Sequence, residues 1–409
     1  MKKMSKTLAV VLALVLCVGL FAGCGGTTAS TSTTTTTQTG TQTAESGEIT
    51  IAFIGNTTGD YAQYGIPVRN AVVMYVEQLN ANGGINGKTV KLLEYDDKGD
   101  GIESVNAYNL AKDQGITAIV GSVLTGATIA LADATVEDNM PQITASATAA
   151  GVTQIDPENP DSGIRANVFR ACFIDPFQGE KMADYAANKL GAKTAAILFE
   201  SGSDYSEGLK DSFVAKAAEL DLEVVATEAF ATGDKDFNAQ MTKIAGLNPD
   251  VVFLPIYYGE AGLAITQGRQ AGLTSTFLGG DGFGGIKDYA TAEDLEGTVY
   301  CSGYAPGTDS VAQFEADYEA KYGEPVPNMF APLAYDAAML LCKALKAADD
   351  AGLAAGSDEF KAAVIADLKG NDGTVGITGS YSFDEFNNPI KSAAMIVVKD
   401  GAEVFSELY

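Results

Sequence analysis

An alternation of short apolar runs and longer amphipathic stretches begins at Glu48 and continues almost to the end of the chain. The run 49–55 predicts a buried strand, and 66–79 predicts a helix because its apolar residues recur every three or four positions. Val90 opens the next predicted strand. A strand, a helix and a second strand in this order predict a parallel sheet with helices on both faces. The alternation therefore indicates an α/β fold.

The pattern stops near Thr144 and starts again after Pro176, so we expect two α/β lobes of similar size. Further helices are predicted over 104–114, 127–138, 178–190, 205–220, 237–245, 259–271, 311–321, 335–348 and 357–368. Further strands are predicted over 90–95, 118–120, 141–144, 194–199, 223–229, 251–254 and 277–279, with more in the tail 381–405. The length of 409 residues is enough for two hydrophobic cores.

The first residues of the chain are typical of an exported protein. Three lysines precede an apolar run over 8–22, and small residues then precede Cys24, as in the cleavage box of bacterial lipoproteins. We expect 1–23 to be a lipoprotein signal peptide and Cys24 to carry a lipid that anchors the protein outside the cell membrane. Ordinary secretion with an incidental cysteine is the alternative. The stretch 24–47 is mostly Thr, Ser, Gly and Gln and is expected to be a flexible linker.

The chain contains no histidine, and its formal net charge is −27. The absence of histidine excludes Ser-His-Asp catalysis and histidine-ligated metal sites. The acidic charge argues against nucleic acid as a partner, because phosphate requires a basic surface. We therefore predict a protein that is not an enzyme, uses no cofactor or metal and binds no nucleic acid. Catalysis by carboxylates alone is the alternative, but no pair of acids stands out for it.

Three local features suggest a cofactor at first sight, and each has a simpler explanation. Cys172, Cys301 and Cys342 are widely spaced and odd in number, which favours buried free thiols over a disulfide. The acids within 96–100 are better explained by helix capping and a solvated loop than by a metal site. The glycine-rich run 279–285 contains an acid that would repel a pyrophosphate, so we predict a small-ligand loop instead of a dinucleotide site.

Nine short segments carry a resemblance to a known family. They are Gln63-Tyr64-Gly65, 83–88, Tyr95-Asp96-Asp97, 121–128, 144–148, Phe169-Arg170, 204–208, 234–237 and 279–282. Each segment is weak alone, but together their order and spacing are specific. From Ile49 onward the chain resembles type I periplasmic binding proteins, and within them the leucine/isoleucine/valine-binding family of ABC importers.

The resemblance implies two Rossmann-like lobes with parallel-rich central sheets, joined by a hinge of three chain crossings. The first lobe is expected over 48–172 and 302–374, and the second over 173–301 and 375–409. The crossings are expected near 171–175, 299–304 and 373–378. Some relatives have a disulfide in the first lobe, but the matching positions here are Gly99 and Leu124, so no such disulfide is expected.

The resemblance also implies how the cleft would hold the carboxylate of a free amino acid. The hydroxyls of Thr125, Ser146 and Thr148 and the backbone amides near Ala127 and Thr128 match the family's carboxylate site. Elementary electrostatics agrees, because a predicted helix begins here and helix N-termini favour anions. The alternative is that these hydroxyls only cap helices.

The matching acceptor for the ligand's ammonium group is Asp281, assisted by the Tyr205 hydroxyl. Many amino-acid-binding relatives have Glu at this position, and the shorter Asp leaves room for a deeper ligand or a water. The alternative is that Asp281 is only a turn acid. Tyr64, Tyr257 and Phe330 match positions that wall the ligand's side chain, and aromatic walls favour an aliphatic group. Phe330 has a purely structural alternative, packing between the lobes.

The sequence therefore predicts a monomeric extracytoplasmic lipoprotein. It is expected to bind a small amino acid, with Leu, Ile or Val favoured, and to deliver it to the membrane subunits of an ABC permease. Two alternatives keep the same fold. One is a binding protein for another small polar ligand, such as an amide, urea or an aromatic acid. The other is a ligand sensor that reports to a signalling partner.

Overall fold

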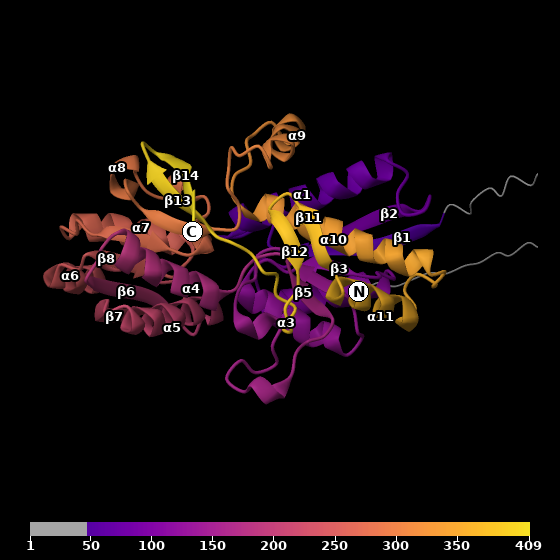
Figure 1. Cartoon of the computed structure of the whole chain (residues 1–409), viewed down its shortest axis with the longest axis horizontal. Coiled ribbons are helices and arrows are strands. Elements are labelled where there is room, and N and C mark those ends of the chain that lie inside the picture. The colour runs from indigo at the N-terminus through magenta and orange to yellow at the C-terminus, as the bar shows by residue number, and fades with distance from the viewer. Residues whose placement is uncertain (1–46) are drawn as a thin grey trace, which may run out of the picture. The chain divides into compact units, whose positions relative to one another are not determined.

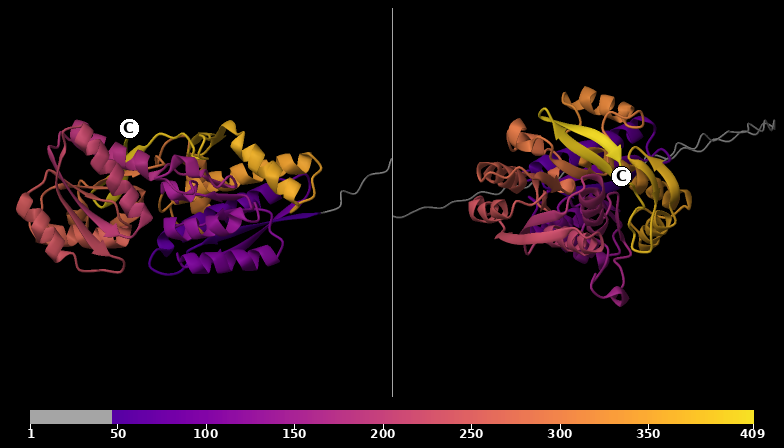
Figure 2. Two further views of the ribbon diagram at one scale, coloured as in Figure 1. Left: turned by 90° about the horizontal axis from the view of Figure 1, so that it is seen from below. Right: turned by 60° about the vertical axis from the view of Figure 1, so that its left-hand side comes forward.

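The structure is a computed structural model that describes residues 47–409 (Figure 1). The predicted signal peptide, Cys24 and the predicted linker up to residue 46 lie outside the described residues. Two large sheets organise the described chain, and Figure 2 shows helices packed around each of them. None of the helices in residues 47–409 is long and apolar enough to cross a membrane.

The first lobe is built on a five-stranded parallel sheet in the order β2-β1-β3-β4-β5. Its strands are β1 (Glu48–Gly55), β2 (Thr89–Asp96), β3 (Ile119–Gly121), β4 (Gln142–Thr144) and β5 (Val168–Arg170). Its helices are α1 (Ala62–Ala81), α2 (Gly101–Asp113), α3 (Thr125–Val136), α9 (Ala312–Tyr322), α10 (Phe330–Asp350) and α11 (Asp358–Lys369). The neighbours Ile51, Ala52 and Phe53 are all buried, as expected for a parallel strand covered on both faces.

The second lobe is built on a seven-stranded sheet in the order β14-β13-β10-β9-β8-β6-β7. Its strands are β6 (Thr194–Ser201), β7 (Glu223–Ala231), β8 (Val251–Leu254), β9 (Thr276–Gly279), β10 (Val299–Ser302), β13 (Ala394–Lys399) and β14 (Ala402–Leu408). Its helices are α4 (Asp175–Asp184), α5 (Asp204–Glu219), α6 (Asn238–Leu247), α7 (Tyr258–Gln270) and α8 (Ala292–Leu295). The pairings of β13 with β10 and with β14 are antiparallel, and the other pairings in this sheet are parallel. The predicted α/β fold with parallel-rich sheets is confirmed.

Helix α1 begins earlier than its apolar pattern predicts, at Ala62 instead of Ile66, and continues through Pro67. A proline within a helix cannot donate to the carbonyl four residues earlier, which here is Gln63. The side chain of Asn328 donates to that carbonyl at 2.9 Å and replaces the missing bond. A distant segment of the chain therefore allows the helix to extend over residues that carry the predicted binding motif.

The predicted third crossing at 373–378 is wrong. This segment forms a hairpin of strands β11 (Asp372–Gly376) and β12 (Gly379–Ser382), which lies beside α10 of the first lobe (Figure 1). The reason is Asp336 on α10, whose buried carboxylate accepts from the amides of Ile377 at 2.7 Å and Thr378 at 2.9 Å. A buried carboxylate needs such donors. The chain joins the second sheet only at β13, so the predicted boundary at 374/375 lies too early.

The other two passages between the sheets are short. The chain leaves β5 at Arg170 and enters α4 at Asp175, and it leaves β10 at Ser302 on its way to α9. Helix α9 packs on the first lobe, where the Tyr322 hydroxyl donates to the carbonyl of Asn70 at 2.6 Å. The predicted free thiols are confirmed, because Cys172, Cys301 and Cys342 are buried and unbridged.

Candidate functional site

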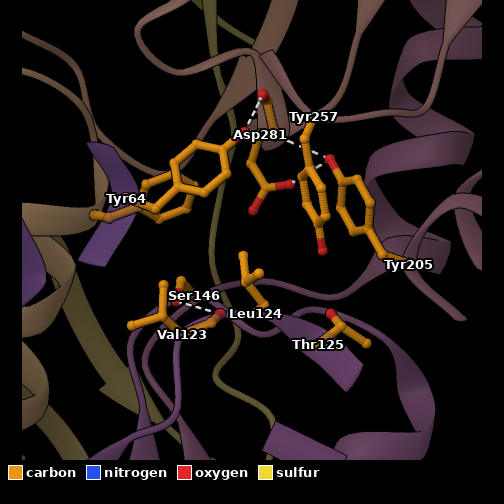
Figure 3. Close-up of a pocket in the computed structure, with 10 residues that line it drawn as sticks. Tyr64, Val123, Leu124, Thr125, Ser146, Tyr205, Tyr257 and Asp281 are labelled. Atoms are coloured by element: carbon orange, nitrogen blue, oxygen red, sulfur yellow. Dashed lines mark hydrogen bonds between the residues drawn. The ribbon is translucent and has the colours of Figure 1, made fainter. Parts of the chain in front are cut away.

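A small pocket with an empty volume of about 240 Å³ lies between the two lobes (Figure 3). Its lining residues are Tyr64, Val123, Leu124, Thr125, Ser146, Tyr205, Tyr257, Asp281, Gly282 and Phe330. Seven of the nine ligand-binding residues predicted from the sequence are in this lining, all except Ala127 and Thr148. The topology therefore brings together side chains that are far apart in the sequence.

Asp281 is the only charged residue in the lining, and it is almost fully buried. It follows β9 in a short 3-10 helix, Asp281–Phe283. Its Oδ1 accepts from the Tyr205 hydroxyl at 2.9 Å and from Nε2 of Gln178 at 3.2 Å. The other carboxylate oxygen points into the pocket (Figure 3). Burial raises the pKa of Asp281 to about 6, although both hydrogen bonds favour its charged form.

The hydroxyl of Tyr205 is held from two sides. It donates to Asp281 and accepts from the amide of Gly282 at 2.9 Å. A Cβ at Gly282 would lie 2.6 Å from this hydroxyl oxygen, so only glycine allows the backbone to approach so closely. Because its single hydrogen goes to Asp281, Tyr205 orients the carboxylate and offers a ligand only its remaining lone pair.

Aromatic rings close the side of the pocket between the lobes. Tyr205 and Tyr257 stack with ring centroids 4.8 Å apart, and Phe330 stands edge-on to Tyr64 at 5.0 Å. The Tyr64 hydroxyl donates across the cleft to the carbonyl of Gly282 at 2.5 Å and accepts from the amide of Tyr258 at 3.2 Å. Tyr64 therefore has two roles, lining the pocket with its ring and joining the lobes with its hydroxyl.

The wall contributed by the first lobe carries no charge. Thr125 is the first residue of α3, and the amide of Thr128 already donates to the carbonyl of Leu124 at 2.9 Å. The amides before Thr128 have no acceptor within the helix, and they lie at its positive end. The Ser146 hydroxyl donates to the carbonyl of Val123 at 2.8 Å, so its hydrogen is not free for a ligand.

Two predicted residues do not line the pocket. Ala127 lies in the first turn of α3 with its side chain in the core, so only its backbone amide faces the helix start. Thr148 is fully buried, its hydroxyl oxygen has no partner in the described chain, and its carbonyl accepts from the amide of Asp175 at 3.0 Å. Thr148 therefore lies behind the pocket, beside the first crossing.

The sequence interpretation missed three lining residues and one supporting residue. Val123, Leu124 and Gly282 lie inside the segments that carry the resemblance, so the signal that could have found them was their position in those segments. Gln178 lies on α4, and its Oε1 accepts a hydrogen bond from the backbone amide of Asp281 at 2.8 Å. Nothing in the sequence pattern distinguishes this glutamine from an ordinary helical residue.

The acids at the end of β2 have structural roles. Asp100 caps α2 by accepting from the amides of Ile102 at 2.8 Å and Glu103 at 3.0 Å. Asp97 is buried and accepts from the amide of Gly99 at 2.9 Å and from two serine hydroxyls. Within residues 47–409 no group of three or more Cys, Asp or Glu side chains is arranged to hold a metal ion.

Comparison with known proteins identifies the family. The family model described as "Periplasmic binding protein" matches residues 48–403. The chain belongs to the periplasmic binding protein family. This periplasmic binding protein is 33% identical over 254 residues to "Leu/Ile/Val-binding protein homolog 3" of Brucella melitensis, covering 62% of this chain and 67% of the relative. It is 31% identical over 305 residues to the leucine-, isoleucine-, valine-, threonine- and alanine-binding protein of Pseudomonas aeruginosa, covering 74% and 79%.

Solved structures agree with this assignment. The branched-chain amino acid transporter substrate-binding protein LivJ from Streptococcus pneumoniae, determined in complex with isoleucine, has a TM-score of 0.79 and 32% identity, and the match covers 88% of this chain and 99% of LivJ. The leucine-binding protein LivK of Thermotoga maritima has a TM-score of 0.78 and 31% identity, with 88% and 98% covered. The family resemblance found in the sequence is confirmed.

Proposed function

We propose that this periplasmic binding protein binds a small free α-amino acid in the pocket between its lobes. A branched aliphatic side chain, as in Leu, Ile or Val, is the favoured ligand. The observation that carries the proposal is the arrangement of the pocket, with one buried carboxylate on the second-lobe wall and the start of a helix on the opposite, uncharged wall. The names of the similar Leu/Ile/Val-binding proteins support the same ligand class.

The two walls match the two charges of a zwitterion. Burying an ammonium or a carboxylate group without partners costs several kcal/mol, so a pocket for a free amino acid needs an acceptor and a set of donors. Asp281 supplies the acceptor through the oxygen that faces the pocket. The amides at the start of α3 and the hydroxyl of Thr125 supply the donors.

The remaining surface of the pocket determines which ligand side chain fits. Tyr64, Tyr257 and Phe330 contribute rings, and Val123 and Leu124 contribute aliphatic groups. The pocket is narrow, because its empty volume of about 240 Å³ includes space open to solvent, and this favours a compact ligand. Both features favour a short branched side chain over a long or charged one.

The site is proposed to bind and release its ligand without altering it. The protein then acts as a monomer that delivers the ligand to an ABC permease, and the closed form of the two lobes is what the permease recognises. The proposed location is outside the cytoplasm, anchored by a lipid on Cys24. The proposal for the anchor rests on the predicted signal peptide and on Cys24, which lie outside the described residues.

A thermal-shift screen tests the ligand class. The panel contains the twenty amino acids together with amides, urea and aromatic acids. A ligand that binds only the folded protein stabilises it by about 4 kcal/mol at a thousandfold excess over Kd. We expect shifts with Leu, Ile and Val. A shift confined to an amide, urea or an aromatic acid would contradict the amino-acid proposal and keep only the fold.

A further inference from the structure

A second buried carboxylate lies behind Asp281 and is connected to it. Asp175, the first residue of α4, is fully buried. The Nε2 group of Gln178 donates to Oδ1 of Asp281 at 3.2 Å and to Oδ1 of Asp175 at 3.4 Å. One amide group thus bridges the two acids. Neither the sequence interpretation nor the role proposed for Asp281 uses Asp175.

No cation of the described chain is hydrogen-bonded to either acid, although the charge of Arg170 lowers the pKa of Asp175. The titratable or charged side chains that face the pair are Tyr64, Arg170, Cys172, Asp204, Tyr205, Tyr257 and Cys301. Arg170 is the only positive one, and its guanidinium donates to the carbonyls of Ala147 at 2.9 Å and Ala149 at 3.0 Å instead of to either acid. Two adjacent carboxylates in such surroundings do not both ionise easily.

Two buried oxygens beside the pair make no hydrogen bond of good geometry in the described chain. They are Oδ2 of Asp175 and the hydroxyl oxygen of Thr148. The Thr148 hydroxyl favours the charged form of Asp175 and offsets only part of the effect of burial on its pKa. The two residues are neighbours across the first crossing, since the Asp175 amide donates to the Thr148 carbonyl at 3.0 Å. An ionised carboxylate oxygen that is buried without a donor is costly, whereas a protonated one carries a hydrogen of its own.

We propose that Asp175 and Asp281 share one proton in the empty pocket and that the ammonium group of the bound ligand displaces it. The inference rests on the proposed function, because it requires a ligand with an ammonium group beside Asp281. In this exchange one O–H bond breaks, its proton passes to solvent, and both carboxylates become ionised beside the ammonium. Asp175 does not touch the ligand in this scheme, and it is a positioning residue that sets when Asp281 is charged.

Burial raises the pKa of both acids. It raises the pKa of Asp281 to about 6, and burial together with the charge of Asp281 raises the pKa of Asp175 well above its ordinary value. The empty protein therefore holds more protons than the liganded protein in mildly acidic solution. By linkage, the affinity for the ligand must then rise with pH up to the pair's apparent pKa and level off above it.

Calorimetry of leucine binding between pH 5 and pH 8, in two buffers with different ionisation enthalpies, tests the proposal. We expect the wild-type protein to release close to one proton per leucine at the acidic end. The affinity is expected to rise about tenfold per pH unit there and to level off toward pH 8. In Asp175→Asn the pH range in which leucine binding releases a proton should move down by at least about one pH unit, because Asp281 no longer interacts with a second acid. Asp204→Asn, which removes an acid whose charge raises the pKa of Asp175 less than Asp281 does, should shift the profile less than Asp175→Asn does.

Leucine binding without proton release in the wild-type protein would overturn the inference and leave the proposed function intact. If no amino acid binds, the proposed function fails, and the shared proton is then tested in the ligand-free protein. An acid whose pKa is raised by folding stabilises the folded state below its unfolded pKa, and this stability is lost as pH rises through the folded pKa. Asp175→Asn should therefore raise the unfolding temperature at pH 8 more than at pH 4.5. Equal shifts at both pH values would contradict the shared proton.

Discussion

The second-lobe wall of the pocket contains side chains that are hydrogen-bonded to one another, whereas the part of the first-lobe wall opposite Asp281 is the start of a helix. On the second-lobe side Asp281, Tyr205 and Gln178 form one connected set, with distances of 2.8–3.2 Å. On the first-lobe side Thr125 is the first residue of α3, and the Ser146 hydroxyl donates to a backbone carbonyl. The second-lobe wall is charged and held by hydrogen bonds, whereas the first-lobe wall is neutral and offers several backbone amides as hydrogen-bond donors.

The two walls should contribute to the binding free energy in different ways. A single buried carboxylate concentrates the interaction with an ammonium group in one residue, and its hydrogen bonds fix that residue before the ligand arrives. A helix start spreads the interaction with a carboxylate over several amides, so each donor contributes a smaller share. Substitutions on the two walls should therefore have very different effects.

The largest effect is expected from Asp281→Asn. The change keeps the shape of the side chain but removes the charge that faces the pocket. A charge-assisted hydrogen bond contributes about 1.5–3 kcal/mol, so the affinity for leucine should fall by about tenfold to a hundredfold. Titration calorimetry measures the loss, and circular dichroism checks that the variant is folded. A loss below about threefold would show that Asp281 does not hold the ammonium group.

Tyr205→Phe should have a smaller effect on leucine binding and should also lower the stability of the folded protein. The change leaves the buried amide of Gly282 without its acceptor and removes one donor to Asp281. An unpartnered buried group costs about 1–3 kcal/mol, which should appear as a lower free energy of unfolding in urea. Leucine affinity should fall less than in Asp281→Asn, because the carboxylate remains. Unchanged stability would contradict the picture of a rigidly held second-lobe wall.

Thr125→Val should weaken leucine binding less than Asp281→Asn does. Valine keeps the shape of threonine and removes only the hydroxyl, while the amides of the α3 start remain. The expected loss is about 0.5–1.5 kcal/mol, the usual net value of one neutral hydrogen bond. If Thr125→Val weakens binding as much as Asp281→Asn, the donors are not shared among the amides, and the contrast between the walls does not hold.

The smallest effect is expected from Ser146→Ala. The hydrogen of the Ser146 hydroxyl already goes to the Val123 carbonyl, so the hydroxyl has no hydrogen to donate to a carboxylate. The expected change in binding free energy is less than about 1 kcal/mol. A larger loss in calorimetry would mean that the hydroxyl turns to the ligand and that the first-lobe wall rearranges on binding.

The sequence predicted much of this contrast, and its failures have specific physical reasons. Asp281 and Thr125 could be placed because each lies in a motif at the end of a predicted strand. Leu124 was missed because the sequence pattern does not distinguish an apolar residue in a hydrophobic core from one that lines a pocket. Gln178 was missed because helical periodicity does not reveal which polar side chain supports a buried acid.

Long-range contacts account for the remaining differences. The helical pattern placed the start of α1 after Gln63, because it could not include the Asn328 side chain that replaces the hydrogen bond lost at Pro67. The third crossing was placed too early because the resemblance to the family does not reveal which contacts of this chain hold the segment 373–378. In the structure the buried carboxylate of Asp336 draws that stretch onto the first lobe.

Two analogues of leucine that have its shape but each lack one charge test whether the pocket holds a zwitterion. Isocaproate lacks the ammonium group, and isoamylamine lacks the carboxylate. In titration calorimetry at pH 7.5 we predict that leucine binds and that each analogue binds at least about a hundredfold more weakly, because each leaves one wall of the pocket without its partner. Binding of either analogue with the affinity of leucine would show that the pocket does not require both charges of an amino acid.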